Sequence, residues 1–268
     1  MVRGLYISAS GALVAQANVD LIANNLANVN TGGFKRSLMQ IASDQPMDLY
    51  RIQTDPGQVS GAALPGVPTM APIGKLGMGA QISDTRTSFA QGALEQNGNP
   101  LNFALQGNGF FTIQTPQGLR YTRNGDFVRN AQGLLTTQDG NLVLGQKGAI
   151  TIPPDGTILV DGQGNISVQL AAQGSVPTQL DQVRITQFAN PFQLRPQGDN
   201  LFVDQGAQPI ADQQTSVYQG MLEKSNADVI RSMVDLISNQ RWFDANEKSI
   251  AAQDDATSLA IQQVARTN

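Results

Sequence analysis

The chain has 268 residues and a net charge of −4, and it contains neither His nor Cys. Only 14% of its residues are charged, against about a quarter in a typical globular domain, and 31 Gln and 19 Asn supply much of the polarity. The missing residue types exclude Ser-His-Asp triads, Cys-His pairs, histidine or thiolate zinc sites and disulfides. The acidic balance argues against a nucleic-acid-binding protein. The composition favours a building block over an enzyme, and no cofactor or metal is expected.

Helix-breaking residues are confined to the middle of the chain. All 13 prolines lie between Pro46 and Pro209, and the last 48 residues, 221–268, contain neither Pro nor Gly. Both ends of the chain are therefore predicted to form long helices. No run approaches the 18 or so uninterrupted apolar residues of a membrane span, and no compact apolar region of a cleaved signal peptide follows the N-terminus.

The first segment carries an apolar pattern that steps alternately by three and four residues. It reads Leu5, Ser8, Ala12, Ala15, Val19, Ile22, Leu26 and Val29. Four such heptads predict a coiled-coil-like seam on a helix over residues 3–31. Gly32 and Gly33 supply the expected stop.

Residues 55–80 are rich in Gly, Pro, Ala and Met and carry almost no charge. This composition indicates a loosely ordered or irregular linker in the monomer. Its apolar residues, among them Leu64, Val67, Met70 and Ile73, are expected to become buried only if another molecule covers them.

Short apolar runs separated by turn dipeptides follow. The segment 108–113 and the segment 119–122 flank a candidate turn at residues 115–118, and further turns are predicted at Gly-containing pairs up to residue 162. This spacing is typical of hairpins in a small sandwich or barrel. The segment 161–165 has some likeness to a calcium loop, but it lacks the acidic ligands and the distal Glu, so a turn is favoured.

The last segment contains a candidate capping box, with Ser225 as the N-cap and Asp228 three residues later. A seam through Val229, Met233, Leu236 and Ile237 continues, shifted by about one residue, through Trp242 to Leu259. Each terminal helix could pack on its own domain. Two long helices flanking a breaker-rich middle favour pairing with each other instead.

A search for reactive motifs finds little. The Gly-rich strings at residues 77–79 and 107–109 lack the remaining residues of a phosphate-binding loop. Asp254 and Asp255 diverge by about 100° on a helix, which suits a solvated face better than paired acid and base.

One string is specific. Residues 22–36, Ile-Ala-Asn-Asn-Leu-Ala-Asn-Val-Asn-Thr-Gly-Gly-Phe-Lys-Arg, closely resemble the signature of bacterial flagellar rod and hook proteins, the axial proteins of the basal body. Residues 97–111, 121–127 and 219–228 resemble further segments of the same family. Length and the 55–80 segment are most similar to rod subunits of the distal type. The proximal type is the second possibility, and the hook protein fits less well because there is no room for its further outer domain.

The resemblance implies an α+β fold with a mainly β middle. Its terminal helices, residues 1–34 and 222–268, would pair as a coiled coil. An extended linking domain would comprise 35–92 and 206–221, and a β-rich outer domain 93–205. The terminal helices would be disordered until neighbouring subunits cover them.

The resemblance also implies partners and a location. The chain would polymerise with itself into a helical tube and contact other rod proteins, the hook protein and bushing ring proteins. It would reach the basal body through the flagellar type III export apparatus, without membrane insertion and without binding nucleic acid.

The residues expected at subunit interfaces lie on the two terminal helices and in the signature string. They are Leu5, Ala12, Val19, Ile22, Asn24, Asn25, Leu26, Asn28, Val29, Gly33, Phe34, Val229, Met233, Leu236, Ile237, Trp242 and Leu259. For Asn24, Asn25 and Asn28 two roles stay open: hydrogen bonds across subunits, or simply the polar face of the helix.

Two other classes remain at this stage. A glycan-binding β module with coiled-coil ends would use the abundant amides of the β region, because Asn and Gln suit sugar hydroxyls. An enzyme acting through carboxylates alone is the third and weakest hypothesis.

Overall fold

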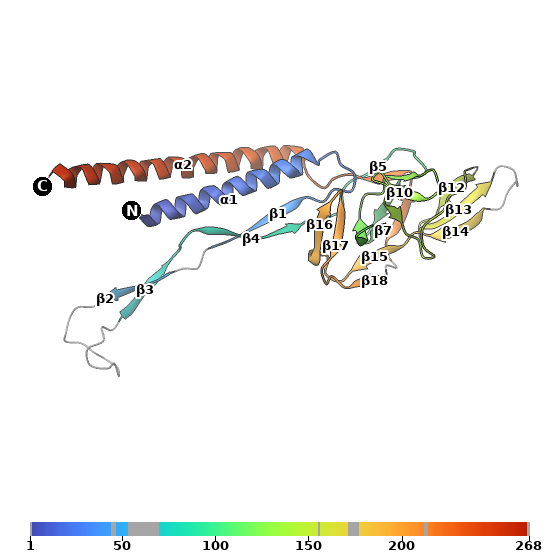
Figure 1. Ribbon diagram of the computed structural model, residues 1–268, viewed down its shortest axis with the longest axis horizontal. Coiled ribbons are helices and arrows are strands. Elements are labelled where there is room, and N and C mark those ends of the chain that lie inside the picture. The colour runs from blue at the N-terminus through green and yellow to red at the C-terminus, as the bar shows by residue number, and fades with distance from the viewer. Residues whose placement is uncertain are drawn as a thin grey trace, which may run out of the picture. The chain divides into compact units, whose positions relative to one another are not determined.

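A computed structural model describes residues 2–43, 47–52, 70–154, 156–170, 177–211 and 214–266 (Figure 1). It contains an N-terminal helix, a β-rich middle and a C-terminal helix, as an α+β chain should. Most of the expected 55–80 linker, including Leu64 and Val67, lies outside the described residues. The chain consists of two units: Met1–Ile22 with Met39–Thr85 and Val234–Asn268, and Ala23–Leu38 with Arg86–Met233.

The first helix, α1, spans Val2–Ala27 and ends four residues before the predicted position. The reason is local: the Asn28 side chain donates a hydrogen bond of 2.9 Å to the Asn24 carbonyl, and turns follow up to Thr31. Asn competes for backbone groups in this way and so favours helix ends. The stretch Gly4–Ala27 is long and apolar enough to cross a membrane, by length and composition only. The core helix of a soluble protein and an N-terminal signal sequence pass the same test.

The second helix, α2, spans Val229–Arg266. The predicted capping box is wrong by three residues. Asp228 is the capping residue, because its carboxylate accepts a hydrogen bond of 3.0 Å from the Arg231 N–H. Ser225 instead accepts a hydrogen bond of 3.2 Å from the Ala227 N–H, in the turn that precedes the helix.

Within the first unit, α1 and α2 lie side by side and run in opposite directions (Figure 1). Two short antiparallel ladders also contribute to this unit. One joins β1 (Ser37–Ser43) to β4 (Ala80–Thr87), and the other joins β2 (Met47–Ile52) to β3 (Met70–Leu76). Residues 70–76 were expected to be irregular. They form a strand because β2 supplies a partner ladder, which the composition of 55–80 alone does not reveal.

The second unit contains a nine-stranded sheet around β7 (Phe110–Thr115) and β8 (Gly118–Thr122). These two strands form the predicted hairpin, with Thr115 opposite Gly118. The other strands of this sheet are β9 (Phe127–Arg129), β10 (Leu135–Thr137), β11 (Leu142–Val143), β15 (Ile185–Phe188), β16 (Leu194–Gly198), β17 (Leu201–Asp204) and β18 (Pro209–Ala211). A 3₁₀ turn, η2 (Pro191–Gln193), precedes β16.

Three smaller ladders complete the second unit. They are β12–β13–β14 (Gly156–Val160, Asn165–Leu170, Thr178–Gln182), β19–β6 (Ser216–Gln219, Phe103–Gln106) and β20–β5 (Met221–Glu223, Leu94–Gln96). In the last two, strands that follow the sheet pair with strands that precede it. The segment leading to α2 is thereby attached to the β unit.

Two apolar clusters form the core of the second unit. One lies around Phe103, Phe111 and Phe127, with Phe111 and Phe127 packed edge to face at 5.1 Å between ring centroids. The other lies around Phe110, Phe188 and Phe202 and is also built from edge-to-face aromatic pairs, a geometry that aromatic quadrupoles favour.

The segment 161–165 is a turn, as favoured from the sequence. The Asp161 carboxylate accepts hydrogen bonds from the Gln163 and Asn165 N–H groups, both 2.9 Å, and from the Asn165 side chain at 2.7 Å. Desolvation acts to raise the pKa of this carboxyl, but these hydrogen bonds outweigh it and the pKa is lowered. The carboxylate therefore stabilises the β12–β13 turn itself.

Candidate assembly surfaces and the buried junction

The face of α1 that meets α2 consists of small and polar residues. Ser8 Oγ lies 3.1 Å from Ser249 Oγ, and Asn18 donates a hydrogen bond of 2.7 Å to Asn239. Gly4 lies against Gln253: a Cβ at Gly4 would be only 2.7 Å from that side chain. The small residues on α1 leave room for these side chains of α2.

The register of this contact is regular. Gly11 lies against Asn246, where a Cβ would be 2.9 Å from the amide oxygen. From Gly4 to Gly11 the chain advances by seven residues, while the partner position moves back by seven, from Gln253 to Asn246. The two contacts are thus spaced seven residues apart on each helix, in opposite chain directions.

The predicted seam on α1 coincides with the buried face at alternate positions. Ser8, Ala15 and Ile22 are buried, whereas Ala12, Val19, Leu26 and Val29 are half-buried and Leu5 is exposed. At the positions between, the contacts with α2 lie one residue earlier, at Gly4, Gly11 and Asn18, because small size or hydrogen bonding selects them.

On α2 most apolar residues of the predicted seam do not face α1. Met233, Ile237 and Leu259 are 50%, 52% and 58% exposed, and Val229 and Trp242 are exposed as well. Leu236 is half-buried, and so is Ser249, a polar residue in the part of the seam between Trp242 and Leu259, which contacts Ser8 of α1. Most apolar residues of the seam thus form an uncovered surface, while polar residues meet α1.

The three asparagines of the signature string have different environments. Asn25 is buried, and its side chain both accepts a hydrogen bond of 2.9 Å from the Ser37 N–H and donates one of 2.8 Å to the Ser37 carbonyl. Asn28 donates to the Asn24 carbonyl, and Asn24 is exposed. Asn25 therefore has neither of the two roles considered from the sequence: it holds the chain after α1 in an extended path.

Gly33 lies against the segment that follows β8. Its N–H donates a hydrogen bond of 2.7 Å to the Glu223 carbonyl, and its φ of +67° is in the left-handed region. A Cβ here would be 2.3 Å from the backbone nitrogen of Asn124. Only glycine fits this place without displacing backbone. The next residue, Phe34, is half-buried.

A buried ion cluster, Lys35–Glu223–Arg123, lies beside Gly33. Lys35 Nζ is 2.6 Å from Glu223 Oε1, and Arg123 Nη1 is 3.6 Å from Glu223 Oε2; all three side chains are at most 1% exposed. Lys35 also donates to the Ala90 carbonyl, and Gly92 N–H donates to Glu223 Oε1. The cluster joins the signature string, the segment before α2, the 90–92 loop and the end of β8.

The electrostatics of the cluster are unbalanced, with two cations and one anion. Desolvation by burial, together with the Arg123 charge, lowers the pKa of Lys35, although Glu223 opposes this shift. Arg123 has further support: its Nη2 donates a hydrogen bond of 2.6 Å to the Gly107 carbonyl, and its guanidinium lies 4.9 Å from the centre of the Phe110 ring. Glu223 is the one anion in the cluster.

Asn226 connects the same segments. Its side chain accepts a hydrogen bond of 2.7 Å from the Arg36 N–H and donates to the Ser88 and Ala90 carbonyls. Lys35, Glu223 and Asn226 lie inside the family-like strings 22–36 and 219–228, but the sequence predicts no role for any of them. The available signal was the occurrence of charges in strings that are otherwise poor in charge.

Three stretches of the chain match known protein families. Residues 5–35 match the family described as flagella basal body rod protein, residues 104–186 the flagellar hook protein FlgE/F/G D1 domain, and residues 218–263 the flagellar basal body rod FlgEFG protein C-terminal. Lys35 and Glu223 of the buried ion cluster lie in the first and the third of these stretches.

Full-length relatives agree. The chain is 36% identical to the flagellar basal-body rod protein FlgG of Agrobacterium fabrum, over 98% of this chain and 99% of the relative. It is 35% identical to FlgG of Caulobacter vibrioides, over 94% and 95%, and 29% identical to the basal-body rod protein FlgF of the same organism, over 100% of both chains. The chain therefore belongs to the family of flagellar basal-body rod proteins.

Proposed function

We propose that the chain is a structural subunit of the distal part of the flagellar rod, where copies polymerise into the helical tubular shaft that transmits torque from motor to hook. The observation that supports this most directly is the similarity to FlgG proteins along nearly the whole chain. The lower identity to FlgF makes a proximal rod subunit the second candidate. As a flagellar basal-body rod protein, it is located in the basal body of the flagellum.

We further propose that α1 and α2 pair as an antiparallel coiled coil. The contacts of Gly4, Ser8, Gly11 and Asn18 with α2 support this arrangement. Such a pair, rich in small and polar contacts, has little apolar burial of its own. Its stability would therefore depend on neighbouring subunits, in keeping with ends that order on assembly.

The exposed apolar surface of α2 is proposed as a contact between subunits. Met233, Ile237 and Leu259 form part of it, and each exposes about half or more of its surface. A contact between two different patches, repeated by a screw operation, does not close and gives a helical polymer. Torque would then pass through many repeated contacts, and no catalytic step is required.

We make further proposals about interfaces, domains and partners. The other residues of the signature string, among them Leu26, Val29 and Phe34, would contribute to interfaces. The three-domain division (1–34 with 222–268, 35–92 with 206–221, and 93–205) would describe the assembled subunit. Other rod proteins, the hook protein, bushing ring proteins and the type III export apparatus would be its partners, with no cofactor.

Replacing Ile237 by Asp tests the proposed assembly surface. Each lost apolar contact would cost about 1.5–3 kcal/mol of association free energy, which is at least about a tenfold weaker contact. We expect the variant to be stable and exported but absent from isolated basal bodies, and cells relying on it not to swim. Gln240→Asp, an exposed change on the same helix, is the control and should support motility. Normal swimming with Ile237→Asp and Leu259→Asp together would contradict the proposal.

Replacing Gly11 by Leu tests the helix pair. Leu is about 0.8–1 kcal/mol better than Gly in a helix interior, so the isolated helix gains stability. The side chain would nevertheless collide with Asn246 and separate the helices. We expect net destabilisation of the first unit, seen as faster amide hydrogen exchange over 2–22 and 234–266. Ala23→Leu, at an exposed site on α1, should leave exchange unchanged; equal protection in both variants would argue against the pairing.

A further inference from the structure

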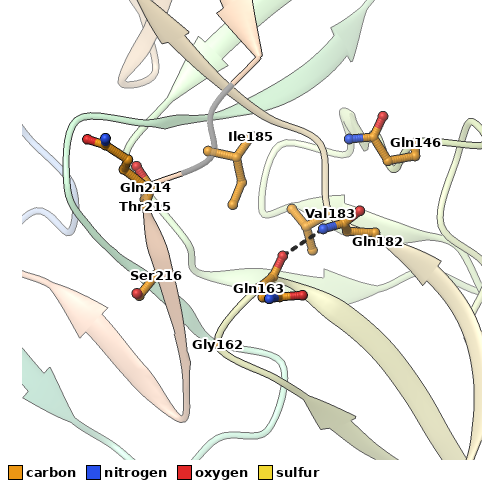
Figure 2. Close-up of a pocket in the computed structure, with 9 residues that line it drawn as sticks. All are labelled: Gln146, Gly162, Gln163, Gln182, Val183, Ile185, Gln214, Thr215 and Ser216. Carbon is orange, nitrogen blue, oxygen red and sulfur yellow. Dashed lines mark hydrogen bonds between the residues drawn. The ribbon is translucent and has the colours of Figure 1, made fainter.

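A cavity of about 450 Å³ opens on the second unit. It is lined by turns and strand ends at residues 146, 162–163, 182–183, 185 and 214–216 (Figure 2). Its size is within the usual range for small-molecule sites. None of its lining side chains is ionisable, so the cavity offers no charge to a ligand.

The polar groups around the cavity are mainly carboxamides. Figure 2 shows Gln146, Gln163, Gln182 and Gln214 around it, with Ser216 beside them. Each carboxamide offers both donors and an acceptor. The Gln146 and Gln163 carboxamides make no hydrogen bond within the described part of the chain, and Gln182 uses its NH₂ group to donate to the Gln163 carbonyl at 2.9 Å.

One accessible aliphatic side chain lies among these amides. Ile185 is half-buried and lines the cavity, whereas Val183 beside it is buried. The side-chain amides provide hydrogen bonds for hydroxyl or acetamido groups, and Ile185 provides a small surface for C–H groups. These are the two kinds of surface that a pyranose ring presents.

The backbone near the cavity is already paired, which weighs against an extended peptide as the ligand. Gln146 N–H donates to the Gln182 carbonyl, Val183 N–H to the Gly164 carbonyl, and Val217 N–H to the Gly162 carbonyl, at 2.8–3.0 Å. A peptide that adds to a sheet needs free backbone groups on an edge. Recognition here has to come from side chains.

We propose that this amide-lined cavity binds a neutral, hydroxyl-rich saccharide. The site belongs to the β unit of a single subunit, so it is independent of the proposed assembly in the rod. The amide content of the β region favours glycan binding, and we assign that binding to this cavity. It would be additional to the structural role of the chain.

Saturation-transfer NMR on the full-length monomer tests the site. The probes are N,N′,N″,N‴-tetraacetylchitotetraose and cellotetraose, which differ in their acetamido groups, and a neutral Gln/Ser-containing tetrapeptide. We expect transfer to at least one saccharide and none to the peptide. The variant Gln146→Ala/Gln163→Ala removes two carboxamides that make no internal hydrogen bond. At about 1 kcal/mol for each lost hydrogen bond, it should bind at least tenfold more weakly.

The control is Gln117→Ala/Gln132→Ala, two exposed glutamines outside the cavity, which should bind like the parent chain. Absence of transfer to either saccharide overturns the proposal, as does transfer that persists in the Gln146→Ala/Gln163→Ala variant or transfer to the peptide alone. Because the readout uses unassembled protein, a negative result leaves the rod function intact. A failure of assembly would likewise leave this site unaffected.

Discussion

Gly33→Ala is expected to destabilise the second unit by roughly 2–5 kcal/mol. A left-handed backbone costs a non-glycine residue about 1–2 kcal/mol, and forcing extra atoms into a packed site adds about 1–3 kcal/mol. Both apply here, because φ is +67° and the new Cβ would lie 2.3 Å from Asn124 N and 2.5 Å from the Arg123 carbonyl carbon. These are backbone atoms, so no side-chain rotation relieves the collision.

The effect should extend beyond Gly33 itself. Its N–H donates to the Glu223 carbonyl, so a shift of this segment also disturbs the buried ion cluster. Urea unfolding followed by far-UV circular dichroism measures the loss of unfolding free energy. Gly140→Ala is a suitable control, since Gly140 has a φ of +83° and no atom within 4 Å of its Cβ position. Gly140→Ala therefore measures the free-energy cost of the left-handed backbone alone. Equal losses in the two variants would show that the close approach at Gly33 contributes nothing.

Much of the secondary structure follows from the position of helix breakers and turn residues. The sequence predicts long helices at both ends because Pro is absent from both and Gly occurs there only as Gly4 and Gly11. Pro116 and Gly118 in turn define the hairpin turn at residues 115–118. The strand at 70–76 was missed, because its stability comes from pairing with β2 and not from its own composition.

The helix faces were harder to predict for a physical reason. A seam is usually sought among apolar residues, but here Gly4, Gly11 and Asn18 also meet α2. Contacts of glycine with partner side chains and amide hydrogen bonds give no hydrophobic period. Most apolar residues of α2 that the sequence highlights are exposed, and we propose that neighbouring subunits cover them.

The buried cluster could not be predicted because its members are far apart in sequence. Lys35, Arg123 and Glu223 come from three segments that only the strand pairings bring together. The side-chain amides occur in two different environments in the structure. Asn25 and Asn226 satisfy backbone groups inside the second unit, whereas Gln146 and Gln163 remain available at its surface.

Glu223→Gln is expected to destabilise the second unit by about 3–5 kcal/mol, the usual cost of leaving a buried charge without its partner. Gln keeps the shape and an acceptor for Lys35 Nζ and the Gly92 N–H. It removes the charge that Lys35 and Arg123 share, so two cations remain buried without an anion. Chemical denaturation of the full-length monomer measures the change.

Two further variants separate this charge effect from the loss of one hydrogen bond. Glu95→Gln makes the same chemical change in the Lys224–Glu95 pair, which is 2.7 Å long but more than half exposed; it should cost less than about 1 kcal/mol. Lys35→Met removes a cation and leaves Arg123 and Glu223 as a neutral pair, so it should cost less than Glu223→Gln. If Lys35→Met proved the more destabilising of the two, packing of the Lys35 side chain would outweigh charge balance.

If Glu223→Gln costs more stability than Lys35→Met, as expected, Glu223 is the residue that keeps the signature string and the segment before α2 docked on the β unit. Its loss should then expose both segments to proteolysis before the β core unfolds.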